Sequence, residues 1–141
     1  MKSPRQGGFL ISKVHRTAGR VFSRMLRERN IDINPAQGRI LFVLWESGSI
    51  PIHELAERVS LGKSTLTASL DRLEAMGQVM RVPSPDDRRK ILIVPTPKNK
   101  EMHALYEEVS NEMNDVFYRG FSHKEIDQFE DYLQRVLNNL V

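Results

Sequence analysis

Cysteine is absent from this 141-residue sequence. A chain without cysteine forms no disulfide bond, offers no thiolate ligand to a metal and has no thiol for nucleophilic or redox chemistry. Such a composition is typical of proteins in a reducing compartment. We therefore expect a cytoplasmic protein that responds to no thiol oxidation.

Long hydrophobic runs are missing as well. The apolar stretches are far shorter than the ~20 residues that a membrane-spanning helix requires. Lys13, Arg16 and Arg20 interrupt the N-terminal segment, so it lacks the apolar core of a signal peptide. We expect no membrane partner.

Charge is distributed unevenly along the chain, although the net charge is only +3. Residues 1–51 hold 9 Lys or Arg against 3 Asp or Glu, and residues 52–100 hold 9 against 6. Residues 101–141 reverse the balance, with 3 against 9. A basic beginning and an acidic end indicate either an anionic partner or pairing of the two ends, and both interpretations stay open.

Hydrophobic periodicity predicts a mainly helical chain. Apolar residues recur at three- and four-residue steps over 9–29, with basic residues on the opposite face. A capping box of Asn34 and Gln37, with Pro35 between them, opens a second helix that ends near Gly48. After an extended Ser49-Ile50-Pro51, two short helices are predicted at 52–59 and 63–76, joined by Ser60-Leu61-Gly62.

The period changes after Gly77. Residues 79–82 and 91–94 are short β-type runs around a polar loop, which predicts a β-hairpin. Thr96-Pro97 is predicted to cap a long helix, and Ser122 with Glu125 forms a capping box for the last one. The first and last helices are too apolar on one face to stand alone.

The helix at 63–76 has the outer surface of a DNA-reading helix. Small hydroxyl and methyl side chains reach base edges, phosphates and thymine methyl groups in the major groove, and the free amides at the helix start favour phosphate. Arginines on a projecting loop suit a narrow minor groove. The predicted DNA contacts are Lys63, Ser64, Thr65, Thr67, Ala68 and Arg72 on the helix and Arg88, Arg89 and Lys90 on the hairpin tip.

Two carboxylates lie beside these arginines. Carboxylates repel phosphates, so Asp86 or Asp87 is predicted to orient an arginine through a fork-shaped pair.

Four segments together resemble the MarR family of transcription regulators. They are Ile52-His53-Glu54-Leu55-Ala56, Gly62-Lys63-Ser64-Thr65-Leu66-Thr67, Leu70-Asp71-Arg72-Leu73-Glu74 with Gly77, and Pro85-Asp86-Asp87-Arg88-Arg89. The chain departs from the family pattern at Ala68, where a basic residue is common. It also lacks the glycine of the family's Leu-Thr-x-x-Gly after the wing, so the long helix is expected to start differently.

The resemblance implies a fold that is mainly α with a small β-hairpin wing. A winged helix-turn-helix domain (35–96) would lie between an N-terminal dimerisation helix (1–34) and C-terminal dimerisation helices (97–141). Helix 63–76 would enter the major groove and Arg88 the minor groove, with Asp86 holding the wing arginine. The expected dimer contacts are Leu10, Val14, Phe117, Phe129, Leu133, Val136, Leu137 and Leu140.

The function that follows is sequence-specific binding of double-stranded DNA. We expect a homodimeric repressor on a pseudo-palindromic operator, released by a small-molecule effector bound between the dimer helices and the winged unit. Activation in place of repression stays open, and so does the identity of the effector. The basic stripe on the first helix fits either an anionic effector or pairing with the acidic last helices, and we favour pairing.

Three alternatives compete with this interpretation. Gly62-Lys63-Ser64-Thr65 resembles the end of a phosphate-binding loop, but Glu57 stands where that motif needs glycine, so we predict no enzyme, catalytic residue or cofactor. No two histidines are three or four residues apart, and no metal site is predicted, although one assembled from His103, His123 and carboxylates stays open. A winged module that binds protein is disfavoured by the basic wing tip and the carboxylate-free start of helix 63–76.

Overall fold

The computed structural model describes residues 4–141, so the first three residues of the predicted region 1–34 lie outside the described residues. The described chain contains six helices and three short strands. In order they are α1 (Gly7–Glu28), α2 (Pro35–Ser47), β1 (Ile50–Pro51), α3 (Ile52–Val59), α4 (Lys63–Ala75), β2 (Val79–Pro83), β3 (Ile91–Pro95), α5 (Asn99–Phe117) and α6 (His123–Leu140). The predicted mainly helical fold with a hairpin wing is confirmed.

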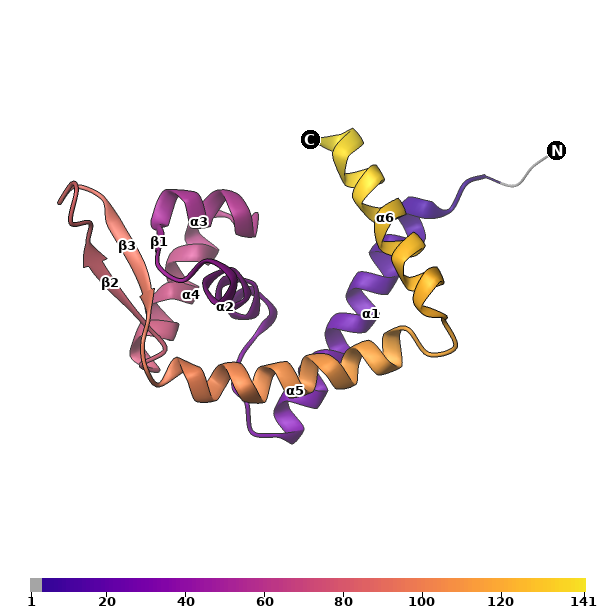
Figure 1. Ribbon diagram of the computed structural model, residues 1–141, viewed down its shortest axis with the longest axis horizontal. Coiled ribbons are helices and arrows are strands. Elements are labelled where there is room, and N and C mark those ends of the chain that lie inside the picture. Colours follow the sequence, from indigo (N-terminus) through magenta and orange to yellow (C-terminus); the bar gives the residue numbers. More distant parts are fainter. Residues whose placement is uncertain (1–3) are drawn as a thin grey trace.

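The elements fall into two groups joined by α5 (Figure 1). One group, which we call the winged unit, contains α2, α3, α4 and the three strands. The other contains α1 and α6, and the turn between α5 and α6 lies at the end of the molecule far from the hairpin. Helix α5 runs from one group to the other and so connects them, as does the segment between α1 and α2.

Two capping boxes fix helix starts by local hydrogen bonds. The Gln37 backbone N–H donates to Asn34 Oδ1, and the Asn34 backbone N–H donates to Gln37 Oε1, both at 2.9 Å. Ser122 and Glu125 form the same reciprocal pair at the start of α6. Both boxes were predicted, because capping satisfies orphan backbone N–H groups with residues only three positions away.

The sheet is antiparallel and has the order β1-β3-β2. Strands β2 and β3 pair from Val79 opposite Pro95 to Pro83 opposite Ile91. Ile50 of β1 pairs with Ile93 of β3, which adds a third strand to the predicted two-stranded hairpin. The extended conformation at residue 50 was predicted, but its pairing partner is distant in the sequence and left no local signal.

The hydrophobic core lies inside the winged unit. Its fully buried side chains come from every helix of that unit and from the sheet, namely Ile40, Leu41, Leu44, Leu55, Leu70, Leu73, Val79 and Ile93. Leu26 of α1 and Val109 of α5 join the same cluster. Burial of Leu66, Leu70 and Leu73 turns the opposite face of α4 outward.

The start of α5 differs from the prediction. The helix begins at Asn99 with Lys98 as N-cap, and no side chain caps it. The Thr96 hydroxyl donates instead to the Gly77 carbonyl oxygen at 2.5 Å. Thr96 therefore does not cap the helix as predicted, because a distant carbonyl takes the hydroxyl that capping would have used.

Candidate nucleic-acid interface

The turn between α3 and α4 leaves the start of α4 open. Ser60 ends α3 in the left-handed conformation, with φ 52° and ψ 44°, and Gly62 precedes α4 in an extended conformation without a side-chain cap. The first-turn amides of a helix have no partner within the helix. With no capping side chain and no acidic residue in that turn, they form a ready site for an anion such as a phosphate.

The outer face of α4 carries the predicted DNA contacts. All six are exposed, namely Lys63, Ser64, Thr65, Thr67, Ala68 and Arg72. Arg72 is also paired, since its Nη2 lies 2.6 Å from Asp32 Oδ2 in the loop between α1 and α2. The structure thus places these side chains on one accessible surface, with Arg72 held by a carboxylate.

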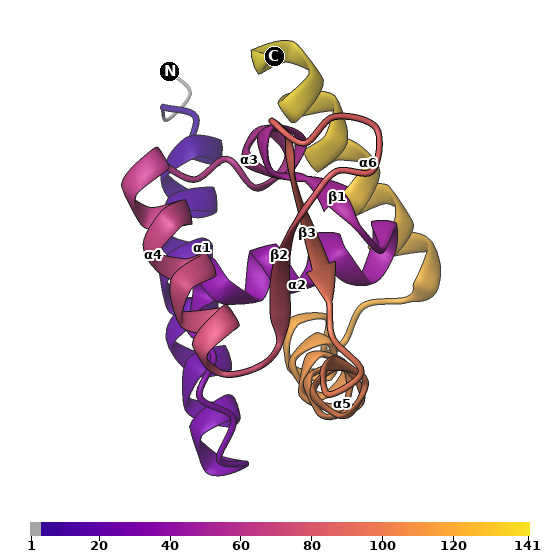
Figure 2. The ribbon, with the colours of Figure 1, turned by 90° about the vertical axis from the view of Figure 1, so that its left-hand side faces the viewer.

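The hairpin lies beside α4 and brings a basic tip with it (Figure 2). Arg88, Arg89 and Lys90 are all exposed at the turn between β2 and β3. The helix face and the hairpin tip therefore belong to the same end of the molecule.

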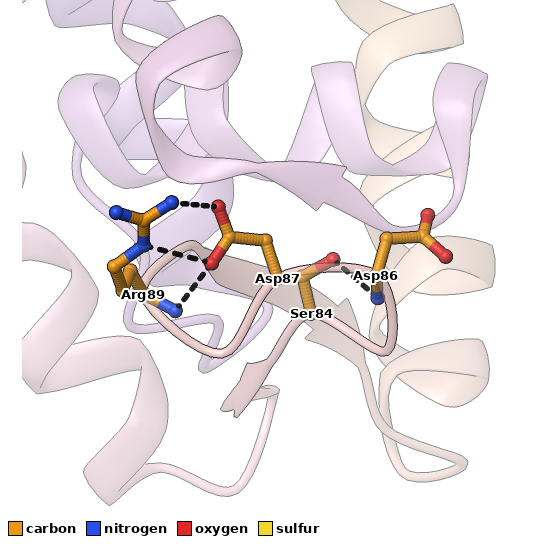
Figure 3. Close-up of polar contacts among 4 residues, drawn as sticks. All are labelled: Ser84, Asp86, Asp87 and Arg89. Atoms are coloured by element: carbon orange, nitrogen blue, oxygen red, sulfur yellow. Dashed lines mark hydrogen bonds and ion pairs between the residues drawn. The ribbon is translucent and has the colours of Figure 1, made fainter.

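The carboxylate that orients a wing arginine in this structure is Asp87, whereas the resemblance had assigned that role to Asp86. Asp87 Oδ1 accepts from the Arg89 backbone N–H at 3.0 Å and from Arg89 Nε at 3.2 Å, and Asp87 Oδ2 accepts from Nη2 at 3.3 Å (Figure 3). These side-chain and backbone hydrogen bonds lower the pKa of Asp87. Asp86 instead donates its backbone N–H to Ser84 Oγ, and its carboxylate points away from Arg89.

The base of the wing is clamped to α4 by a residue that sequence analysis missed. Arg81 of β2 lies 2.8 Å from Asp71 and 3.3 Å from Glu74, measured from Nη1 to the carboxylate oxygens. Its backbone N–H also donates to Glu74 at 3.2 Å. Asp71 and Glu74 are three residues apart on a helix face, which is the one local signal that a basic partner was needed.

The basic stripe on α1 does not pair with the acidic helices inside one chain. Of the stripe, Arg24 approaches only Glu28 of its own helix, at 4.0 Å. Arg29, just beyond the helix end, pairs with Glu108 at 2.8 Å and with Glu112, both on α5. Pairing between the basic and acidic ends is therefore confined to Arg29 within the described residues.

An apolar groove of about 830 Å³ lies between the two groups of elements. Side chains of α1, α2, α3, α5 and α6 line it, including Phe22, Phe42, Tyr106 and Phe129 with Arg39 and Arg58. Burial raises the pKa of Tyr106 to about 12. The groove lies where the resemblance implies an effector.

Most of the predicted dimer contacts are exposed to solvent. Helix α6 has no buried residue at all. Leu137 and Leu140 are 51% and 77% exposed, and Leu10 on α1 is 50% exposed. Phe117 and Phe129 are half-buried against each other, with ring centroids 6.2 Å apart.

The alternative sites show no matching geometry in the described chain. His103 stacks on Trp45, and across residues 4–141 no three metal-ligating side chains gather. In the same range no helix combines the length and the hydropathy of a membrane span. Lys63 follows a helix and a turn, and not the strand that a phosphate-binding loop requires.

Comparison with known proteins points to one family. The model of the MarR family matches residues 33–91. The homoprotocatechuate degradative operon repressor of Escherichia coli is 32% identical over 102 residues, which cover 72% of this chain and 66% of the repressor. The HTH-type regulator YcgE of Bacillus subtilis is 34% identical over 60% of this chain, a match that spans 55% of its own length.

A solved structure extends the likeness to nearly the whole chain. A mutant MarR from E. coli complexed with operator DNA superposes with a TM-score of 0.82 at 27% identity, covering 92% of both chains. The likeness therefore includes α1, α5 and α6 as well as the winged unit.

Proposed function

Because this chain belongs to the MarR family of transcription regulators, we propose that it binds a pseudo-palindromic DNA operator as a homodimer and represses transcription. One relative is a repressor by name and one structural neighbour was solved on operator DNA, which supports both parts of the proposal. Two-fold symmetry of the protein sets the symmetry of the site, with half-site centres about one helical turn apart.

The single observation that carries the DNA-binding part is the joint exposure of α4 and the wing tip. An uncapped helix start without carboxylates lies beside a hairpin that ends in three basic residues. We propose that α4 enters the major groove through Lys63, Ser64, Thr65, Thr67, Ala68 and Arg72, and that Arg88, Arg89 and Lys90 follow the minor groove. Asp87 would hold the Arg89 guanidinium in place through its hydrogen bonds to Nε and Nη2.

Dimerisation would use α1, α5 and α6. The apolar stripe of α6 and the exposed residues at the start of α1 need a cover that one chain does not supply. Their flanking charges are complementary, because the stripe on α1 is basic and α6 is largely acidic. A second copy of the chain meets both requirements.

An effector would bind in the apolar groove. The groove touches α1, α5 and α6 on one side and α2 and α3 of the winged unit on the other. A ligand there would favour one angle between the two groups and so change the spacing of the two α4 helices in a dimer.

The decisive experiment is selection of bound duplexes from random DNA, followed by titration at several salt concentrations. Arg88→Ala should weaken binding to the selected site and reduce the salt slope by about one unit for each phosphate that the variant no longer neutralises. Arg119→Ala, which removes an exposed arginine from the turn between α5 and α6, is the matched control. The wing assignment fails if both variants bind as tightly as the parent, and the whole proposal fails if the parent retains no duplex at low salt.

A further inference from the structure

A buried asparagine stands where the winged unit meets α5. Asn99 is the first residue of α5 and is only 3% exposed. Trp45 Nε1 of α2 donates to Asn99 Oδ1 at 2.5 Å, and Asn99 Nδ2 donates to Gln78 Oε1 at 3.0 Å. Gln78, between α4 and β2, is also 3% exposed. The Asn99 side chain thus links α2 and α5 to the segment between α4 and β2 through one part-buried and one buried hydrogen bond.

The backbone around Asn99 ties the end of α4 to the same place. The Thr96 hydroxyl donates to the Gly77 carbonyl at 2.5 Å, and the Thr96 backbone N–H donates to the Gln78 carbonyl at 3.1 Å. Lys98 Nζ donates to the Met76 carbonyl at 3.2 Å. Three consecutive residues after α4 are therefore held by the segment that leads into α5.

Aromatic contacts also connect the winged unit to α5, but alone they would not fix the angle between them. The Trp45 ring stacks on His103 of α5, with centroids 4.4 Å apart and planes 12° from parallel. It also meets Tyr106 at 5.2 Å. Stacked rings tolerate offsets, whereas hydrogen bonds fix direction, and a fully satisfied buried polar network specifies one arrangement of the parts around it.

We infer that Asn99 is the positioning residue that fixes the angle of the winged unit on α5, and with it the spacing of the two α4 helices across the dimer. The inference rests on the proposed function for its consequence in DNA binding. Its structural part, the fixed angle, concerns one chain and can be measured without DNA.

The angle can be measured by spin labelling because the chain has no cysteine of its own. Ala75→Cys at the end of α4 and Asp115→Cys on α5 replace exposed residues in the two parts. Labelled chains are diluted into unlabelled parent, so that the electron–electron distance within a single chain is recorded. The parent should give a narrow distance distribution.

Asn99→Ala should broaden that distribution. Asn111→Ala removes an exposed asparagine from the same helix and should leave it unchanged. Because loss of Asn99 leaves buried polar atoms of two other residues unpaired, circular dichroism must confirm that the variant is folded. Trp45→Phe, which keeps an aromatic ring but removes the Nε1 donor, is the second variant and should broaden the distribution as well. Distributions identical to the parent in the folded variants would overturn the inference.

Titration of the selected operator duplex separates this inference from the proposed function. If the binding-competent angle falls to about a tenth of the population, the affinity of Asn99→Ala falls about tenfold, while Asn111→Ala binds like the parent. If the variant's distance distribution broadens but the parent protein binds no duplex, the proposed function is rejected, while the role of Asn99 in fixing the angle of the winged unit on α5 is supported. A broadened distribution with unchanged affinity would overturn the link between the angle and DNA binding.

Discussion

The winged unit and helix α6 differ in how far they bury their apolar side chains. The winged unit closes its side chains around a core in which Leu70, Leu73 and Ile93 are wholly inaccessible to water. Helix α6 has a comparable stripe in which no residue is fully buried, with Leu137 half exposed and Leu140 mostly so. The first region covers its apolar side chains within one chain, with Leu26 of α1 and Val109 of α5 in the same cluster, whereas the second leaves its stripe without a full cover.

The largest effect is expected when charge is placed on the exposed apolar stripe of α6. The double substitution Leu133→Glu with Leu137→Glu should convert the dimer to monomer. Each leucine buried in an interface contributes about 1.5–3 kcal/mol, and two-fold symmetry doubles the loss. Sedimentation or light scattering gives the mass, with Gln128→Glu on the same helix as control. A dimer that survives the double substitution would show that α6 is not at the interface.

The converse substitution lies in the core of the winged unit. Leu70→Ala should lower the free energy of unfolding by about 2–5 kcal/mol, because it leaves a cavity in a packed interior. Urea denaturation measures this loss, which should be the same at every protein concentration. The loss from Leu137→Ala should instead depend on protein concentration, as mass action requires of an interface residue. If both variants lost the same free energy of unfolding at every protein concentration, Leu137 would not be an interface residue and the two regions would not differ in this way.

The smallest expected effect concerns the groove between the two regions. Burial raises the pKa of Tyr106 from 10.0 to about 12. As the pH rises from about 10 to about 12, the unfolded chain loses the Tyr106 phenol proton that the folded chain keeps, so the contribution of Tyr106 to stability falls across this window and is constant below it. Tyr106→Phe should make the urea midpoint less sensitive to pH there. Tyr132→Phe on the exposed α6 serves as control, and equal profiles for both variants would show that Tyr106 is solvated.

Local signals made most of the fold predictable. The boxes at Asn34 and Ser122 depend on residues three positions apart, and the burial of Leu66, Leu70 and Leu73 follows from helical spacing. The exposed face of α4 could be predicted for the same reason, since it is what remains when the buried side is assigned.

Contacts between distant segments could not be predicted. The Thr96 hydroxyl had a local use as a helix cap, and only the fold brings the Gly77 carbonyl within its reach. The clamp of Arg81 on Asp71 and the meeting of Trp45 with Asn99 depend likewise on how whole elements pack. The choice between Asp86 and Asp87 at the wing tip was decided by the direction of the turn, which residue type alone does not determine.

Gly38 and Tyr106 lie in close contact, so the residue types allowed at the two positions depend on each other. Gly38 lies on α2 directly against the hydroxyl end of Tyr106 on α5, so a β-carbon at position 38 would collide with that hydroxyl. A side chain at position 38 is therefore tolerated only where Tyr106 shifts or is replaced by a shorter residue, whereas a shorter residue at 106 is compatible with Gly38. Among descendants of a common ancestor the two positions should vary together, with a larger residue on α2 accompanied by a shorter one on α5.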